Sequence, residues 1–435
     1  QRVLSGLGLD PIAIRDLAKY CSSEQARSHH RTLRDKILRG PLARGGDDMT
    51  GSFLKSICAG AMLVAVLSAA TEAATAADLP ITKAAPVPDP DNLFWAEIDY
   101  LGWSAKGDHL PAMITTSPLG TPLAQAGLLG APGTTVLFGN SSINDGWRSG
   151  GRLTAGYWLD PQRNRGIEVS FFDLQSASTG FAADSSAHPI LAQPFINALT
   201  GHQDALLVGF PGLVTGATAV SETSRLLGAG GLYRKDVGVW ANQKITALIG
   251  YRYLHASDGL AMPFAQNAVG ISIVGSDAFH ARTDFHGIDL GLNGEWGRGP
   301  WSLEWRGKIA LGADLTRADI SGTTSVTAGG ITTMFPGGLH ALPSNIGSTS
   351  QTRFAAVPEL SLKAAYRIAP HWQFLAGYDV LYWTGVQRAG GLIDTTINPG
   401  LIPPGGGGGP QRPQPALNTQ SLLAQGLTLG VRYNY

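Results

Sequence analysis

Asp284 and His286, separated by Phe285, have the types and spacing of an acid–base pair. A carboxylate next to an imidazole can help it to activate water, provided that a second carboxylate pair faces it. Alternation along this segment puts both side chains on the same side as Ile288 and Leu290, which is the apolar side of a predicted strand. The sequence offers no facing pair, so an enzyme is the least favoured function class.

Other chemical motifs are missing from the sequence. None of its glycine-rich stretches has the Lys-Ser/Thr ending of a phosphate-binding loop, and the 10 histidines are scattered. Its only two cysteines are Cys21 and Cys58, so the rest of the chain has no disulfide and no thiolate metal site. We therefore expect no catalytic, cofactor-binding or metal-binding residues, and no cofactor.

Composition narrows the choice of partners. The 435 residues include 32 basic and 32 acidic side chains, so the formal net charge is zero. This balance gives no general attraction to nucleic acid, which we do not expect as a partner. No apolar run reaches the roughly 18 residues of a membrane-spanning helix.

The first part of the chain differs from the rest. Residues 49–76 combine a lysine, an apolar run and an Ala-Thr-Ala site, which is the pattern of a signal peptide. Residues 1–48 are then interpreted as an over-extended N-terminus, disordered or weakly helical, with a genuine cytosolic extension as the alternative. Residues 77–92 form a proline-rich periplasmic linker, and residues 93–435 form the folded domain.

Residues 301–316 show the pattern that dominates this domain. Odd positions from Trp301 to Leu315 are mostly apolar, whereas even positions include Glu304 and Lys308. A period of two indicates a strand with one apolar and one polar face. The pattern predicts 10 strands, at 93–103, 151–159, 165–174, 225–234, 244–254, 288–296, 301–316, 359–368, 372–383 and 427–435.

The connections between these strands alternate in length. Short ones are predicted at 160–164, 235–238, 297–300 and 369–371, and long ones at 106–146, 176–217, 256–280, 322–350 and 386–420. This alternation is typical of an all-β, transmembrane, up-and-down antiparallel β-barrel with short periplasmic turns and long extracellular loops. We predict about 10 strands, with 12 as the alternative count. A soluble β-sandwich is the rival fold, but its strands should be shorter.

Strand parity assigns side chains to the lumen and to the membrane interfaces. The predicted lumen-lining residues are Glu97, Asp99, Arg152, Glu168, Lys244, Arg252, Asp289, Glu295, Glu304, Arg306, Lys308, Asp314, Glu359, Lys363, Arg367, Asp379 and Arg432. The predicted aromatic girdle is Trp95, Trp158, Trp240, Trp296, Trp301, Trp372, Tyr433 and Tyr435.

The predicted lumen carries nearly balanced charges, with 8 cations and 9 anions. Such a lumen should be weakly ion-selective, and opposite charges should pair across neighbouring strands because an unpaired buried charge is costly. Glu304 is expected to pair with Lys363 or Arg367.

Two features of the long loops leave alternatives open. The similar Phe-Pro-Gly patches at 209–212 and 335–338 are either packed turns or parts of loops folded into the mouth. Residues 190–199 are either a short helix, a plug in the lumen or irregular coil.

Several loop segments resemble a known family. The segments 113–140, 144–160, 188–195, 209–216, 335–347, 354–360 and 376–383 look like the bacterial beta-barrel porin family first noted in planctomycetes, the seventh so numbered. The resemblance runs through most of 93–435 and implies an outer-membrane barrel of porin type. It carries no catalytic residues. Separately, Asp284 and His286 resemble half of the acid–histidine arrangement of omptin proteases.

The expected function is therefore passive diffusion of small solutes through a porin-like barrel. The alternatives are a structural or adhesive barrel that binds through its long loops, and an enzyme, either an omptin-like protease or a lipid hydrolase. Expected partners are outer-membrane lipid, lipopolysaccharide, small solutes and the barrel-assembly machinery, the last through the C-terminal strand. The expected location is the outer membrane of a Gram-negative bacterium, after signal-peptide-directed export.

Overall fold

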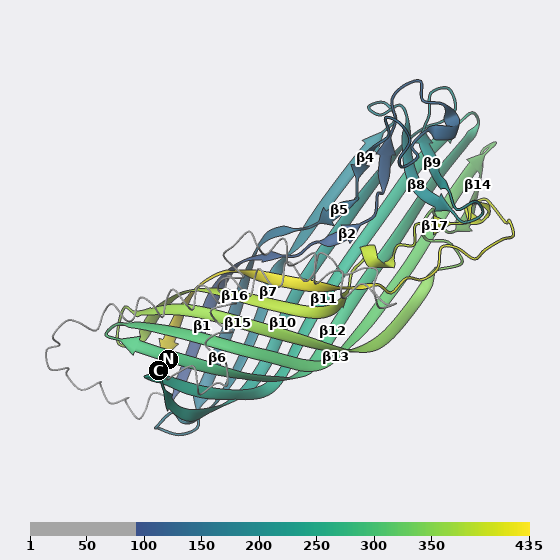
Figure 1. The fold of residues 1–435 in the computed structure, drawn as a ribbon. Coiled ribbons are helices and arrows are strands. Elements are labelled where there is room, and N and C mark those ends of the chain that lie inside the picture. Colours follow the sequence, from purple (N-terminus) through teal and green to yellow (C-terminus); the bar gives the residue numbers. More distant parts are fainter. Residues whose placement is uncertain (1–92) are drawn as a thin grey trace, which may run out of the picture. The chain divides into compact units, whose positions relative to one another are not determined.

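In the computed structural model, the described residues 93–435 form a closed antiparallel β-barrel (Figure 1). Within this range the sheet has 11 strands, but β14 pairs only with β13, and the pairing of β12 with β13 closes a ring of the others. The ring strands are β1 (Phe94–Ala105), β6 (Gly146–Trp158), β7 (Arg165–Asp184), β10 (Thr215–Trp240), β11 (Gln243–Ala268), β12 (Ile271–Arg298), β13 (Trp301–Ala328), β15 (Gly347–Arg367), β16 (Trp372–Gln387) and β18 (Thr419–Asn434). Chain order is kept around the wall, so the predicted up-and-down barrel is confirmed. The predicted N-terminal extension, signal peptide and linker lie outside the described residues.

Short turns connect the ring strands at the end where β18 finishes. The turn predicted at 235–238 is wrong, because β10 continues past a bulge between Asp236 and Gly238. The chain reverses instead at Ala241 and Asn242, whose φ angles are 48° and 64°. Two consecutive positive φ angles match the right-handed twist of a two-residue hairpin, which explains where the strand ends.

Four neighbouring strands are much longer than a membrane crossing requires. The strands β10 and β11 have 26 residues each, and β12 and β13 have 28 each. A tilted strand crosses a bilayer with about 9–11 residues. The long loop predicted at 256–280 is therefore wrong: β11 and β12 continue through it and meet at a turn of Val269 and Gly270.

The remaining elements lie away from the short turns (Figure 1). They are β2 (Asp108–Leu110), β3 (Ile114–Thr116), β4 (Thr135–Phe138), β5 (Ser141–Ile143), β8 (Leu191–Asn197), β9 (Gln203–Gly209), β14 (Ile331–Pro336), β17 (Thr396–Ile397) and the 3-10 turns η2 (Leu123–Gln125), η3 (Gly390–Leu392) and η4 (Pro399–Leu401). The strands β2 and β5 lie about halfway along the barrel, and β4, β8, β9 and β14 lie near its far end (Figure 1). Residues 190–199 thus contain a strand, with Leu191 and Phe195 buried, and not a helix. Over residues 93–435 no helix is long and apolar enough to cross a membrane.

Part of the way along the strands, the outer face of the wall changes from apolar to polar, and the inner face changes from polar to apolar. On β13 the outward Leu311 and Leu315 are 39% and 47% exposed, whereas the next outward residue is Arg317. Inward side chains change in the opposite sense, from Lys308 to the buried Ile320. Since apolar side chains face lipid and polar ones face water, the membrane-spanning part of the wall ends near Arg317. We call the part on the short-turn side the membrane half, and the other part the extracellular half.

Candidate functional site

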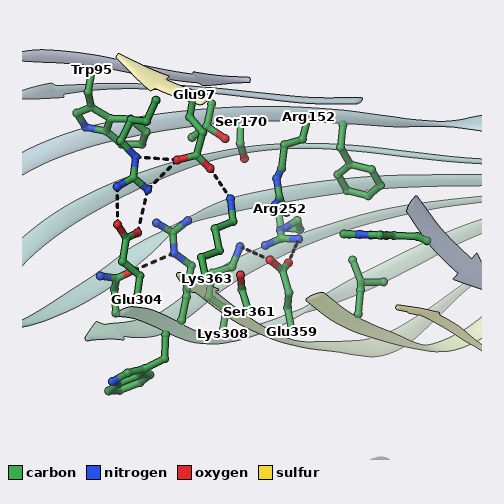
Figure 2. A pocket seen from close by; sticks show the side chains of 18 residues that line it. Trp95, Glu97, Arg152, Ser170, Arg252, Glu304, Lys308, Glu359, Ser361 and Lys363 are labelled. Atoms are coloured by element: carbon green, nitrogen blue, oxygen red, sulfur yellow. Dashed lines mark hydrogen bonds and ion pairs between the residues drawn. The ribbon is translucent and has the colours of Figure 1, made fainter. Parts of the chain in front are cut away.

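The lumen of the membrane half is filled by charged side chains that point inward from the ring strands (Figure 2). Strand alternation places all 17 predicted lumen residues on the inward side. Most of them belong to what we call the charged layer: Glu97, Asp99, Arg152, Glu168, Arg252, Asp289, Glu304, Arg306, Lys308, Glu359, Lys363, Asp379 and Arg432, together with Arg234.

Some ion pairs in the charged layer join adjacent strands. Arg152 on β6 lies 2.9 Å from Asp99 on β1, and Arg252 on β11 lies 2.8 Å from Asp289 on β12. These side chains are buried, so each pair replaces the hydration that both charges lose. Arg152 stands directly opposite Asp99 in the strand register. Asp289 lies diagonally from Arg252, two residues beyond its register partner Gly287, which is still within reach of a long side chain.

Other ion pairs cross the lumen between strands that are not neighbours. Arg306 on β13 lies 2.7 Å from Glu168 on β7, and Arg252 also reaches Glu359 on β15 at 2.6 Å. Only side chains that meet in a narrow interior can make such contacts. The space left among them is a hollow of ≈ 60 Å³, which holds no more than a few waters.

Glu304 does not pair as predicted. It stands directly opposite Lys363 in the strand register, yet it accepts hydrogen bonds from Arg432, whose guanidinium nitrogen lies 2.5 Å away. Lys363 instead contacts Glu97 and lies 2.8 Å from Asp99. Pairing across neighbouring strands alone is therefore too simple, since long side chains in a narrow barrel reach past their register partners.

Four predicted lumen residues lie outside the charged layer. Lys244 pairs with Asp236 at 3.2 Å near the short turns, where Glu295 and Arg367 are exposed. Asp314 lies beyond the charged layer, on the side away from the short turns, and accepts a hydrogen bond from the indole of Trp383 at 3.0 Å.

The aromatic girdle differs from the prediction at two residues. Trp240, Trp301, Trp372 and Tyr435 are 56%, 57%, 45% and 63% exposed on the outer face, where Trp296 and Tyr433 also point, half-buried. Trp95 and Trp158 instead point into the lumen. The guanidinium of Arg234 lies over both rings, 5.5 Å and 5.1 Å from their centroids. Both tryptophans share the parity of charged inward neighbours, Glu97 and Arg152, and this signal was present in the sequence.

A layer of apolar side chains closes the lumen beyond the charged layer. This apolar layer contains Leu101, Trp103, Phe172, Leu174, Leu226, Leu254, Phe285, Ala310, Val357, Leu381, Trp383 and Leu422, with smaller neighbours. The rings of Phe285 and Trp383 are 6.2 Å apart, and those of Trp103 and Phe172 are 5.7 Å apart. All the named members come from ring strands, so side chains of the wall itself close the barrel at this level.

Sequence reasoning missed a second group of buried charges, in the extracellular half. Arg388 is ion-paired with Asp258, and Asp108 accepts the backbone N–H of Gly390. Glu222 lies nearby, fully buried, and neither of its carboxylate oxygens has a partner among the described residues. Burial, and then the negative charges of Asp108 and Asp258, raise the pKa of Glu222 to about 8. All of these residues fall in segments predicted to be loops or at their edges.

The rest of the extracellular half is packed with apolar loop and strand residues. Leu110, Met113 and Leu191 from the loops contact inward wall residues such as Phe279 and Ile320. Asp277 is also buried and accepts backbone N–H groups of Leu339, His340 and Ala341 at 2.9–3.1 Å. The patch at 335–338 therefore belongs to a segment fixed inside the mouth.

The acid–histidine pair lies on the outer face of the barrel. Asp284 accepts hydrogen bonds from Tyr253 and Arg282 and lies 2.8 Å from His255, whereas His286 contacts the hydroxyl of Tyr251. The two members therefore have separate partners. Within residues 93–435 no group of three or more His, Cys, Asp or Glu side chains is arranged to hold a metal ion.

These features define a membrane-spanning β-barrel with an apolar outer face and a charged interior. Residues 95–435 match the family model described as "Putative beta barrel porin-7 (BBP7)", and the chain belongs to this family. A search of curated proteins gave no match.

Solved barrels with some similarity include the translocator domain of the autotransporter NalP from Neisseria meningitidis, with 10% identity, 88% of this chain and 98% of that chain covered, and a TM-score of 0.20. A FadL homologue from Pseudomonas aeruginosa has 8% identity and a TM-score of 0.21, with 79% of this chain and 90% of that chain covered. The toluene transporter TodX of P. putida has 9% identity, coverages of 80% and 91%, and a TM-score of 0.15. These scores are too low to relate the chain to any one of them.

Proposed function

We propose that this barrel lets small solutes cross the outer membrane by passive diffusion, and that the apolar layer is its gate. The observation that carries the proposal is the order of the two layers: a charge-balanced layer of paired side chains, with a hollow of ≈ 60 Å³ left among them, is followed by a constriction built from apolar wall side chains. Hydrophobic constrictions of this kind stop water and ions by dewetting, and they open when side chains move apart. In the conformation described above, the barrel is closed.

Conductance in planar bilayers tests this gate. The variant F172A/F285A removes two rings of the apolar layer, and no side-chain hydrogen bond is lost with either ring. Its control, F354A/F374A, removes two outward rings that are 77% and 44% exposed. We expect rare, small openings in the original protein, frequent openings in the first variant and no change in the control. The openings should show little preference between anions and cations, because the charged layer is balanced.

A structural or adhesive barrel is the second candidate, and the length of β10–β13 favours it. These strands continue far beyond the membrane, and apolar side chains fill the part of the barrel that they form there. Conduction does not need such an extension. If neither the original protein nor F172A/F285A conducts while both are correctly folded, the gate proposal fails and this candidate replaces it. We propose no catalytic role for the chain.

Export completes the proposal. We infer that residues 49–76 direct secretion and that the mature chain begins between Ala77 and Leu79. Mass spectrometry of outer-membrane fractions should identify that N-terminus. Recovery of residues 1–48 in the same fraction would contradict it.

A further inference from the structure

A row of arginines crosses the outer face of four adjacent strands. In the strand register Arg225 on β10 is opposite Ser257 on β11, Ser257 is opposite Arg282 on β12, and Arg282 is opposite Arg317 on β13. All four side chains point away from the lumen, because inward positions on these strands have the other parity. We call this set the arginine row.

The arginine row lies at the height of the outer-leaflet headgroups. Arg317 is 16 residues beyond Trp301, which lies at the short-turn end of β13. At about 3.3 Å per residue and a tilt of about 40°, this separation is about 40 Å along the membrane normal. A bilayer with its headgroups is about 40–45 Å thick. The outward Tyr251 and Leu311 lie closer to the membrane centre and belong to the lipid-facing belt.

The row also contains an unfavourable contact. Arg282 and Arg317 are directly opposed, and like charges at opposed positions of a sheet repel each other. Each of these two arginines has one acidic neighbour two residues along its strand: Asp284 lies 2.6 Å from Arg282, and Asp319 lies 2.9 Å from Arg317. Arg225 pairs with Asp173 on β7 at 3.1 Å. The side chains of Arg282 and Arg317 are nevertheless 58% and 61% exposed, and such surface pairs contribute little. Both guanidiniums therefore keep N–H donors for a further anion.

A hollow of ≈ 490 Å³ lies along the row and is lined by all three arginines together with His280. The surface is hollowed here because the small residues Ser257 and Gly259 lie between larger side chains. A Cβ atom at Gly259 would lie 3.1 Å from the Thr223 hydroxyl, which shows how closely the floor is packed. The hollow thus combines guanidinium, hydroxyl and imidazole groups with the carboxylates of Asp258 and Asp319.

We propose that the arginine row binds the phosphorylated sugar headgroup of an outer-leaflet glycolipid. Guanidinium groups pair with phosphate through two parallel hydrogen bonds, and a phosphate between Arg282 and Arg317 would relieve their repulsion. Ser257 and His280 offer polar partners for sugar hydroxyls, and the acyl chains would continue along the lipid-facing belt. This binding is independent of whether the barrel conducts.

Native mass spectrometry of the purified full-length protein in detergent, titrated with diphosphoryl lipid A, tests the site. The variant R282Q/R317Q removes the opposed charges. The control K235Q/R298Q removes two exposed cations near the short-turn ends of β10 and β12. We expect R282Q/R317Q to bind at least about tenfold more weakly, since charge-assisted hydrogen bonds to phosphate are lost, and the control to bind as the original does. Unfolding temperatures in lipid-free detergent check that both variants fold.

Three further probes identify the ligand class. Dephosphorylated lipid A and phosphatidylglycerol should bind the original protein and R282Q/R317Q equally, and millimolar inorganic phosphate should not displace lipid A. Equal binding of diphosphoryl lipid A to the original and R282Q/R317Q would overturn the proposal. So would a matching loss of phosphatidylglycerol binding, or displacement by inorganic phosphate, because the site would then take any anionic lipid or a free anion.

Discussion

The membrane half and the extracellular half of this barrel are built from the same strands, but the outer face is surrounded by lipid in the first and by water in the second. In the membrane half, apolar side chains such as Ile288 point outward and the lumen holds the charged layer. In the extracellular half, the outer face carries polar residues such as Arg317, and apolar residues such as Phe279 fill the interior. The first arrangement suits a wall surrounded by lipid, and the second is that of a soluble protein. A single β-strand can therefore satisfy both solvents by exchanging the roles of its faces.

The largest expected effect concerns buried carboxyl groups in the two halves. In the extracellular half, Glu222 is unpartnered among the described residues, and its pKa is raised to about 8 from an ordinary 4.5. Below about pH 4 both folded and unfolded states keep the proton, so Glu222→Gln should change little. Between about pH 4.5 and 8 only the unfolded state ionises, so the original protein loses stability that the variant keeps. The variant should be more stable by up to about 5 kcal/mol at pH 9.

Glu359→Gln is the matched control for Glu222→Gln in the membrane half. Glu359 lies 2.6 Å from Arg252 and 3.3 Å from Lys308, so its replacement removes a partner of both cations. It should destabilise the barrel by about 2 kcal/mol at neutral pH, which is the opposite sign. Denaturant unfolding in detergent from pH 4 to 9 measures both variants. The same sign in both at pH 9 would contradict the comparison.

The second prediction concerns inward side chains. Phe279 is fully buried in the extracellular half, and Phe279→Ala should cost about 3–5 kcal/mol through lost contacts and a cavity. Ser170 points into the hollow of the charged layer, and Ser170→Ala should cost less than about 1 kcal/mol. The same unfolding assay decides. Equal costs would mean that the extracellular half is not packed like a soluble core.

The third prediction concerns outward side chains. Leu311→Arg places a charge in the lipid-facing belt and should cost about 2–4 kcal/mol. Val274, 52% exposed on the outer face of the extracellular half, provides the control, and Val274→Arg should cost less than about 0.5 kcal/mol. Folding yield into liposomes, with urea unfolding of the inserted fraction, compares the two. Equal yields would place the membrane boundary elsewhere.

The exchange of faces also explains how much the sequence could predict. In the membrane half, apolar residues recur at odd positions of β11, such as Ile245 and Ile249, so the strand was recognisable. Beyond the boundary the apolar residues Leu260, Met262 and Phe264 occupy even positions. The pattern with one lipid-facing side therefore ends at the boundary, and beyond it the sequence alone predicts a loop.

For the lumen, parity predicted which charges point inward, but not their partners. Arg432 and Glu304 lie on strands that are not neighbours, and their contact depends on how narrow the closed ring is. Arg388 was missed for a related reason. It lies between β16 and β18, outside any alternating pattern, and only the packing of its segment into the mouth brings it to Asp258.

The smallest expected effect is local and concerns the segment fixed in the mouth. Asp277 accepts N–H groups of Leu339, His340 and Ala341, which an asparagine could satisfy only in part because it has a single carbonyl oxygen. Asp277→Asn should therefore lower the local opening free energy of this segment by about 1–2 kcal/mol, seen as faster hydrogen exchange of those three amides. Asp319→Asn, on the exposed outer face, is the control and should leave their exchange unchanged. If Asp277→Asn also leaves it unchanged, the loop is held by apolar packing alone, and the extracellular half resembles a soluble core even more closely.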